Sequence, residues 1–420
     1  MDKFLIHGGN QLYGTIKVSG AKNACLPLMA ASLLVKGKIV IRNVPNLRDT
    51  RTMKKLLEII GAEVTFENGV MEIDATNANN PEAPYELVKT MRASFYALGP
   101  LTARFGRAKI SLPGGCAWGP RPVDLHLKGI EKLGGKVTLD EGYINIETDG
   151  LKGALLHLDI SSVGATGNLL MASVLAEGET VIENAAREPE IVCLIDFLNQ
   201  MGADIKGRET DVLRINGVSE LRPIEFEVIP DRIEAGTYLI TAAAVGGDVL
   251  VEGLDPSHLK AVTDKMLEAG ANIEINENSI RVSSTDQLRA TDVTTNIYPG
   301  YPTDLQAQWI ALMATAKGKC VVTDTVYEDR FTHVPELVRL GIDVKLKGNA
   351  ATVTGVEKLK GAPVMSTDIR ASASMVIAAL MAEGRTELHR IYHLDRGYED
   401  LENKLRGIGA DIKREKGPEI

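Results

Sequence analysis

The chain has 420 residues, of which 44% are hydrophobic and 25% are charged, and its formal net charge at pH 7 is −9. These globular proportions allow two sizeable cores, so two domains are expected. The net negative charge argues against general nucleic-acid binding, because affinity for a phosphate backbone needs lysine and arginine in excess on one face.

The lengths of the apolar runs indicate where the protein is located, and the positions of the cysteines indicate whether it has metal sites or disulfides. No apolar run has the length of a signal peptide or a membrane span, so we expect a cytoplasmic protein without membrane contact. The four cysteines, Cys25, Cys116, Cys193 and Cys320, lie far apart and form no Cys-x-x-Cys pair. Neither a metal site nor a disulfide framework is therefore predicted. Cys25 and Cys193 fall in apolar helical patterns and Cys320 in a strand pattern, which indicates core positions.

Taken in chain order, one sequence event recurs six times. A helical pattern ends in glycine plus a small or apolar residue, and a β-hairpin pattern follows. Successive glycines are separated by 73, 68, 68, 71 and 68 positions, by subtraction of their residue numbers. A period this regular predicts an internal repeat. The endings are Gly61-Ala62, Gly134-Gly135, Gly202-Ala203, Gly270-Ala271, Gly341-Ile342 and Gly409-Ala410.

Each unit has the same predicted contents. A short leading strand, such as residues 15–18, precedes a helix that is apolar nearly all round. A β-branched strand, a loop and an amphipathic helix follow. In the third unit that last helix carries an apolar stripe on one side only, formed by Ile191, Leu194, Ile195, Leu198 and Met201. The apolar helices are expected at 23–35, 94–105, 166–176, 236–245, 305–316 and 372–382.

The all-apolar helices determine the predicted architecture. A helix without a polar face must be buried on all sides, so these six helices are central and the sheets surround them. Six units in one ring would leave a hole, whereas two groups of three give two compact α/β domains. The turn-rich residues 217–231 mark the break. The last unit lacks a full strand after Gly409, and the first residues of the chain are a candidate partner for it.

Polar residues mark the start of every buried helix. Helix capping is one explanation for Ser162, Asp304 and Asp368. Capping cannot explain the cations, because a positive charge at a helix start opposes the helix dipole. A bound anion, phosphate or carboxylate, would offset that cost. The residues concerned are Lys22 with Asn23, Arg92, Ser162 with Gly164, Asp231 with Arg232, Asp304, and Asp368 with Arg370.

The stretch 111–128 contains the candidate nucleophile. Cys116 lies among glycines and prolines that exclude a helix or central strand, and Arg121 follows closely. An exposed thiol beside positive charge acts as a nucleophile or proton carrier, and the glycines would let the loop move as a lid. The alternative is that Cys116 is a small apolar core residue. His126 is a candidate to tune the thiol, although an isolated histidine is more often a surface or capping residue.

Two further strand-to-helix loops carry charged residues. They contain Glu328 and Arg330 in the fifth unit and Arg396 in the sixth. Ligands of α/β units bind beyond the carboxyl ends of strands, so we expect these loops and the helix starts to meet at one cleft between the domains.

Eight motifs together carry a family resemblance. They closely resemble the UDP-N-acetylglucosamine 1-carboxyvinyltransferase family of enolpyruvyl transferases, in the right order and over nearly the whole chain. The motifs are GAKNA (20–24), MRAS (91–94), GGCAWGPRPVDLH (114–126), SVGAT (162–166), ENAAREPEI (183–191), YPTDLQAQ (301–308), TDIRASAS (367–374) and YHLDRGYE (392–399).

The resemblance implies a fold and a reaction. The fold is two inside-out α/β barrel domains, each of three repeated βαβαββ-type units around buried helices and joined by two crossovers. The expected domains are 22–229, which carries the Cys116 loop, and 1–21 plus 230–420. The implied reaction moves the enolpyruvyl group of phosphoenolpyruvate to the 3′-hydroxyl of UDP-N-acetylglucosamine and releases phosphate, the first committed step of peptidoglycan synthesis. It implies a cytoplasmic monomer without cofactor or metal and a target of fosfomycin.

The resemblance also implies residue roles. Cys116 would donate a proton to the methylene carbon, form a covalent pyruvyl adduct and be alkylated by fosfomycin, while Asp304 would take the proton of the sugar hydroxyl. Phosphoenolpyruvate would contact Lys22, Asn23, Cys116, Arg121 and Arg396. The nucleotide sugar would contact Arg92, Arg121, Pro122, Val123, Asp124, Leu125, Ser162, Val163, Gly164, Asp304 and Val326, with Arg232, Asp368 and Arg370 as a supporting network. Ile160 departs from the lysine of some relatives, which weakens the expectation for the diphosphate contacts.

Two other functions remain as alternatives. Enolpyruvyl transfer to shikimate 3-phosphate uses the same fold, but the Cys116 loop and residues 121–126 favour the nucleotide sugar. A ring-shaped DNA clamp would also use repeats, but it needs basic helices around a wet hole, whereas these inner helices are apolar. The required chemistry agrees with the residue types: an acid for the alkene carbon, a base for the hydroxyl and cations for the anionic substrate.

Overall fold

The computed structural model describes residues 2–112, 123–327 and 329–417. The chain forms two compact units, residues 1–19 with 230–420 and residues 20–229. We call them the terminal unit and the internal unit. The sequence-based boundary after residue 21 lies two residues beyond the observed one after Ser19, and the second boundary, after Ile229, coincides with the observed one. Among the described residues, no helix combines the length and apolar character that crossing a membrane requires.

The internal unit contains three four-stranded sheets of one design. In each sheet a leading strand pairs in parallel with a second strand, which pairs antiparallel with a hairpin. Asn68 and Gly69 have positive φ, as the predicted hairpin turn requires. The sheets are β14(Glu225–Glu227)-β3(Lys38–Arg42)-β5(Val70–Asp74)-β4(Glu63–Glu67), β6(Glu82–Ala83)-β7(Arg107–Ser111)-β9(Tyr143–Glu147)-β8(Lys136–Asp140) and β10(Leu155–His157)-β11(Glu179–Glu183)-β13(Val212–Asn216)-β12(Asp204–Lys206).

The terminal unit repeats this design, with one change in its last sheet. There the N-terminal strand lies between two C-terminal strands and pairs antiparallel with both. The predicted pairing of the first residues with the segment after Gly409 is therefore confirmed. The sheets are β2(Leu12–Lys17)-β15(Gly247–Glu252)-β17(Ser279–Ser283)-β16(Asn272–Ile275), β18(Val293–Thr294)-β19(Lys319–Thr323)-β21(Ala350–Thr354)-β20(Asp343–Lys347) and β22(Pro363–Met365)-β23(Arg385–His389)-β1(Lys3–His7)-β24(Asp411–Glu415).

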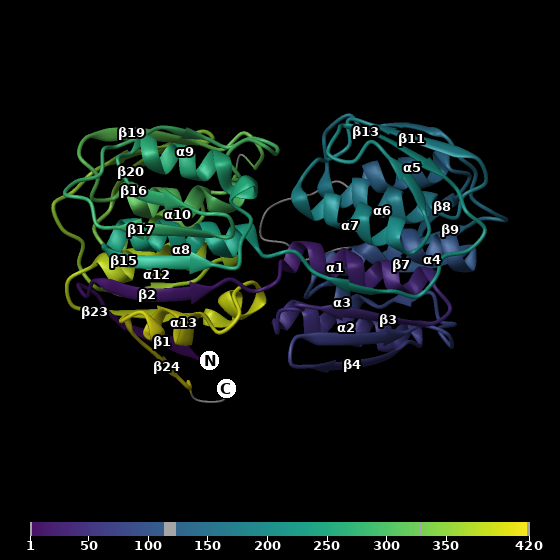
Figure 1. The fold of residues 1–420 in the computed structure, drawn as a ribbon, viewed down its shortest axis with the longest axis horizontal. Coiled ribbons are helices and arrows are strands. Elements are labelled where there is room, and N and C mark those ends of the chain that lie inside the picture. The colour runs from purple at the N-terminus through teal and green to yellow at the C-terminus, as the bar shows by residue number, and fades with distance from the viewer. Residues whose placement is uncertain (1, 113–122, 328, 418–420) are drawn as a thin grey trace. The chain divides into compact units, whose positions relative to one another are not determined.

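Six helices form the centres of the two units, as their apolar surfaces predict. In the terminal unit α10 packs against both α8 and α12, and Figure 1 shows the three stacked within that unit. In the internal unit α4 packs against α6. The inside-out α/β architecture is confirmed. The central helices are α1(Lys22–Ala31), α4(Leu98–Phe105), α6(Val163–Ser173), α8(Arg232–Val245), α10(Gln306–Met313) and α12(Ile369–Met381).

Each of the six sequence repeats contains a second helix, so each of the two units has three of them. These helices are α2(Arg48–Ile60), α5(Asp124–Lys132), α7(Pro189–Gln200), α9(Lys260–Glu268), α11(Val334–Arg339) and α13(Leu401–Gly407). Short helical turns precede or extend the main helices: η1(Ser32–Leu34), α3(Tyr85–Val88), η2(Arg92–Ala97), η3(Pro256–Leu259), η4(Thr303–Leu305) and η5(Ile391–Arg396).

Helix α7 is more buried than its sequence pattern predicts. The expected stripe from Ile191 to Met201 is buried, but Cys193 and Phe197 outside it are buried too. Strand β14 covers this part of α7, because its Phe226 packs edge-on against Phe197 at 5.3 Å between ring centroids. The prediction of one apolar side was therefore too narrow.

Two leading strands are exchanged between the units. The sequence-based repeat assigns strand 15–18 to the helix that follows it, but β2 pairs in parallel with β15 of the terminal unit. Likewise β14 precedes α8 of the terminal unit but pairs with β3 of the internal unit. The chain consequently passes between units at Ser19–Gly20 and at Ile229–Pro230. These are the two expected crossovers.

Gly20 at the first crossover is predicted to tolerate no side chain. An added Cβ would lie 1.8 Å from the carbonyl oxygen of Asn43, which is backbone and cannot turn aside. We expect Gly20→Ala to lower unfolding stability by about 1–3 kcal/mol, measured by urea denaturation. The control is Gly407→Ala, since a Cβ there meets nothing within 4 Å. Equal stability of the two variants would contradict the packing argument.

Candidate active site

Lys22 begins α1 in a buried ion pair. Its ammonium lies 2.6 Å from Oδ2 of Asp49 in α2, and the two side chains are 9% and 4% exposed. The sequence analysis expected a bound anion to offset the cost of a positive charge at a helix start. In the structure the carboxylate of Asp49 lies beside that charge, and the sequence analysis did not predict this partner. Asp49 lies in the first turn of an amphipathic helix, where an acidic residue is ordinarily explained by the helix dipole.

Four of the nucleotide-sugar residues predicted in the internal unit, Arg92, Ser162, Val163 and Gly164, fall at two helix starts. Ser162 caps α6, since its Oγ accepts a hydrogen bond from the Ala165 amide at 3.3 Å. Val163 and Gly164 form the first turn of that helix, and Arg92 begins η2. The capping explanation thus holds for Ser162. The other amides of the first turn have no acceptor within the helix, as at any helix start.

His126 is a neutral, buried residue of the internal unit. Its Nδ1 lies 3.0 Å from Nδ2 of Asn168, whose Oδ1 accepts a hydrogen bond from the Gly99 amide. That second bond fixes the amide orientation, so Asn168 donates to Nδ1 and the histidine proton resides on Nε2. Burial, followed by the charge of Arg92, lowers the pKa of His126 to about 4. A Cβ on Gly164 would lie 3.4 Å from His126 Nε2, so this ring adjoins the predicted nucleotide-sugar turn.

The thiol loop itself falls outside the described residues. Asn23 occupies the second position of α1, but Cys116, Arg121, Pro122 and Glu328 are not described, and their roles stay predictions. The remaining cysteines lie in the cores as predicted: burial raises the pKa of Cys193 to about 12 and that of Cys320 to about 11. Such thiols are inert at neutral pH.

Residues that follow the loop border a groove within the internal unit. Val123 precedes α5, and Asp124 and Leu125 form its first turn. Leu125 lines a groove of about 380 Å³ together with the lysines of α5 and residues 156–159. Ile160, next along the chain, is 64% exposed.

Asp304 lies between two arginines in the terminal unit. Its Oδ1 is 2.8 Å from Nη1 of Arg330, and its Oδ2 accepts from Nη2 and Nε of Arg370 at 3.1 and 3.2 Å. Burial alone would raise the pKa of Asp304, but the charges of Arg370 and Arg330 outweigh it and hold that pKa well below its usual range. Its side chain makes no cap bond to η4, so the capping explanation fails here.

Arg370 extends this cluster into the buried core. Its side chain is only 6% exposed, its guanidinium lies 5.5 Å from the centroid of the Tyr398 ring, and its Nη1 has no hydrogen-bond partner among the described residues. Asp368 caps α12 by accepting from the amides of Arg370 and Ala371. The predicted neighbours Asp304, Asp368 and Arg370 are thus within one network. Tyr398 is a member that the sequence analysis did not identify.

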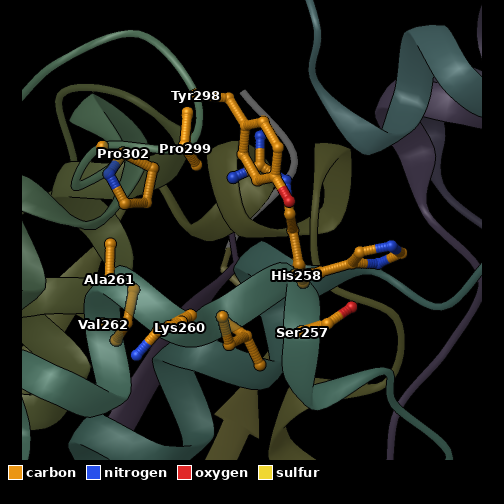
Figure 2. A pocket seen from close by; sticks show the side chains of 11 residues that line it. Ser257, His258, Lys260, Ala261, Val262, Tyr298, Pro299 and Pro302 are labelled. Atoms are coloured by element: carbon orange, nitrogen blue, oxygen red, sulfur yellow. The ribbon is translucent and has the colours of Figure 1, made fainter. Parts of the chain in front are cut away.

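Arg232 forms a separate feature at the start of α8. Its guanidinium lies 5.6 Å from the Tyr298 ring centroid, and both residues line a pocket of about 20 Å³, enough for about one water. Figure 2 shows Tyr298 and His258 on one side of this pocket and Pro302 and Ala261 on the other. The charge of Arg232 also lowers the pKa of Asp304, which places it in the same electrostatic field.

Two more predicted residues follow strand ends in the terminal unit. Val326 belongs to the loop after β19, and its amide donates to Oδ1 of Asp324 at 3.0 Å. Arg396 ends η5 beside Asp395, which Arg414 of β24 holds through two hydrogen bonds of 2.6 and 3.1 Å. Around Asp304 the terminal unit therefore holds buried cations and a carboxylate in fixed geometry, a combination suited to an anionic substrate with an exchangeable hydroxyl proton.

Comparison with known proteins covers the whole chain. The family model described as EPSP synthase (3-phosphoshikimate 1-carboxyvinyltransferase) matches residues 6–405. A relative from Trichlorobacter lovleyi, named UDP-N-acetylglucosamine 1-carboxyvinyltransferase, is 53% identical over 419 residues that span 100% of both chains. A relative of the same name from Chloroherpeton thalassium is 54% identical over 99% of this chain and 97% of its own.

Solved structures agree on the fold. The enolpyruvyl transferase NikO from Streptomyces tendae superposes with a TM-score of 0.90 at 26% identity over 99% of both chains. EPSP synthase from Acinetobacter baumannii has a TM-score of 0.76 at 19% identity, covering 99% of this chain and 100% of its own, which shows the fold alone. With its repeats, its fold and its full-length relatives in agreement, the chain belongs to the enolpyruvyl transferase family, within the UDP-N-acetylglucosamine 1-carboxyvinyltransferases.

Proposed function

We propose that the protein transfers the enolpyruvyl group of phosphoenolpyruvate to the 3′-hydroxyl of UDP-N-acetylglucosamine, with release of phosphate. The observation that carries this proposal is the identity of 53% to a named carboxyvinyltransferase over the full length of both chains. The buried arginines around Asp304 support it, because the reaction needs fixed positive charge near an anion and an acceptor for the hydroxyl proton.

The proposed reaction proceeds by addition and elimination. The 3′-hydroxyl oxygen bonds to C2 of phosphoenolpyruvate while Cys116 delivers a proton to C3. The adduct then loses a C3 proton and the phosphate, which restores the double bond in the product. Lys22, Arg121 and Arg396 neutralise the anion, with Asn23 beside them. Cys116 is also proposed to add reversibly to the pyruvyl unit and, as a nucleophilic thiol, to be alkylated by fosfomycin.

Asp304 is proposed to receive the hydroxyl proton. Both of its oxygens are bound by guanidinium groups, which hold its pKa well below the usual range and so make the ionised carboxylate an acceptor but a weak base. An anionic substrate that draws Arg370 toward itself, with Arg330 left in place, would raise the pKa of Asp304. The base would thus gain strength only with substrate present.

The nucleotide sugar is proposed to bind at the helix starts and at the loops beside them. Arg92, Ser162, Val163 and Gly164 offer a cation and first-turn amides for the diphosphate. Residues 121–125 and Val326 hold the uridine and sugar, and Arg232, Asp368 and Arg370 support the pocket. We further propose that the enzyme acts as a cytoplasmic monomer without a metal or cofactor, in cell-wall synthesis and so in cell shape and division.

Acceptor choice tests the proposed function. The full chain is incubated with phosphoenolpyruvate and either UDP-N-acetylglucosamine or shikimate 3-phosphate, and released phosphate is measured. We expect release only with the nucleotide sugar. Release with shikimate 3-phosphate alone would favour the competing acceptor, which the matching family model names.

The variant Asp49→Asn tests whether Lys22, which pairs with Asp49, binds phosphoenolpyruvate. The amide cannot form the 2.6 Å ion pair with the buried Lys22 ammonium, so we expect unfolding stability to fall by about 3–5 kcal/mol. Because phosphoenolpyruvate would supply the missing negative charge, it should raise the melting temperature of the variant more than that of the parent. The control is Asp264→Asn, whose partner Lys260 is exposed. An equal ligand shift in parent and variant would argue that Lys22 does not contact this anion.

A further inference from the structure

Asp324 is a buried carboxylate at the end of β19 for which sequence reasoning found no role. It is fully buried, and its backbone is tied to Asn349 by hydrogen bonds of 2.9 and 3.0 Å. Its Oδ1 accepts three bonds, from Oγ1 of Thr295 at 2.8 Å and from the amides of Val326 and Tyr327 at 3.0 and 2.8 Å. This oxygen therefore fixes the loop that carries Val326.

The other carboxylate oxygen leads to the Asp304 cluster. Oδ2 of Asp324 accepts from Oγ1 of Thr303 at 2.7 Å, and the same Thr303 oxygen accepts from Nη1 of Arg330 at 2.9 Å. That Nη1 lies 2.8 Å from Oδ1 of Asp304. A continuous chain thus runs from one carboxylate through a hydroxyl and a guanidinium to the other.

The direction of these bonds matters. A threonine hydroxyl has one hydrogen, and Asp324 accepts it, so the hydroxyl lone pairs remain for Arg330. A carboxylate imposes this orientation because it can only accept hydrogen bonds when ionised. Arg330 is 11% exposed, so few water molecules can replace the contact.

We propose that Asp324 is a positioning residue for the transfer reaction: through Thr303 it holds Arg330 against Asp304, and through its other oxygen it holds the Val326 loop. This inference rests on the proposed function, in which Asp304 receives the hydroxyl proton and Val326 contacts the nucleotide sugar. The side chain of Asp324 would then position both the base, Asp304, and the Val326 loop, which forms one side of the sugar-binding site.

Asp324→Asn separates the two tasks of this side chain. The three donors at Oδ1 require an oxygen there, so the new amide nitrogen takes the place of Oδ2 and faces Thr303. The amide donates, which forces the threonine hydrogen to turn away and competes with Arg330 for the hydroxyl oxygen. The Val326 loop keeps its contacts. Thr303→Val, a nearly isosteric change, removes the same link and leaves the carboxylate in place.

The experiment measures kcat, both KM values and melting temperature for the parent, Asp324→Asn, Thr303→Val and the double variant. We expect each single variant to lose about tenfold in kcat/KM for the nucleotide sugar, mainly in kcat. The double variant should lose little more than either single one, because both break the same chain. Thr263→Val is the matched control, since its buried hydroxyl donates to the carbonyl groups of Leu259 and Lys260 and takes no part in this chain of bonds.

The outcomes separate this inference from the proposed function. If the parent releases no phosphate with the nucleotide sugar, the proposed function fails. If the parent is active and both single variants stay within about twofold of it, the inference is overturned alone. Losses that multiply in the double variant, or an equal loss in Thr263→Val, overturn it as well, because they indicate general destabilisation. Should Asp324→Asn fail to fold, Thr303→Val alone decides, by the same twofold limit against Thr263→Val.

Discussion

Cys116→Ala is expected to abolish turnover at neutral pH. In the proposed reaction the thiol is the acid that protonates C3 of phosphoenolpyruvate, and alanine offers no proton. General acid catalysis contributes about 10²- to 10⁴-fold, so the residual rate should fall by at least that factor. The measurement is phosphate release under saturating substrates, with Cys320→Ala as control because Cys320 is buried in β19.

Cys116→Asp distinguishes the acid from the nucleophile. A carboxyl group also delivers a proton, so we expect this variant to stay active and to resist alkylation by fosfomycin, which needs the sulfur. Full activity of the alanine variant would remove Cys116 from the mechanism. Fosfomycin sensitivity of the aspartate variant equal to that of the parent would place the alkylated group elsewhere.

Asp304→Asn is expected to lower kcat by about 10²- to 10⁴-fold, because the amide cannot take a proton from the sugar hydroxyl. The variant should also unfold more easily at pH 7, since Arg330 and Arg370 lose the charge that holds them. Phosphate release and urea denaturation measure the two effects.

The pH dependence of that stability loss follows from the pKa of Asp304. The two arginines hold it far below the value of an unfolded aspartate, about 4, so the ionised carboxylate stabilises the native state above that value. This contribution declines as the pH falls below about 4, and the difference between parent and variant should shrink with it. Asp248→Asn, which removes an exposed pair with Arg281, should change little. A stability difference between parent and Asp304→Asn that stays constant from pH 7 to pH 3 would contradict the ion-pair account.

The repeat and the layering could be predicted because they depend on local signals. Glycine ends a helix in the left-handed conformation, as Gly61 and Gly202 do, and such positions recur at a fixed period. Helices that are apolar all round, such as α6, have only one place in a globular unit. Neither inference needs knowledge of which strands pair.

The strand exchange and the extra cover on α7 could not be predicted in this way. Strands of three to six residues, such as β14 and β2, pair wherever a free sheet edge lies, and that depends on the assembled units. For the same reason the cover that Phe226 gives α7 is invisible in the helix's own sequence.

The candidate site could be predicted in part. Residue types at helix starts indicated Lys22 and Arg370, because a cation there conflicts with the dipole, whereas the role of Asp304 came from the family resemblance. Their partners could not be inferred: Asp49 comes from another helix, and Asp324 acts through Thr303. Hydrogen-bonded chains depend on distances of tenths of an ångström, which no sequence pattern encodes. The roles of Cys116 and Arg121 remain predictions.

Turnover in deuterium oxide tests the central claim most directly. The full chain is supplied with phosphoenolpyruvate and UDP-N-acetylglucosamine, and the product is isolated and examined by nuclear magnetic resonance and mass spectrometry. Addition and elimination predict an enol ether on the 3′-oxygen with deuterium in its methylene group and one phosphate released per product. A product without deuterium in that group, or phosphate release without a 3′-enol ether, would contradict the account.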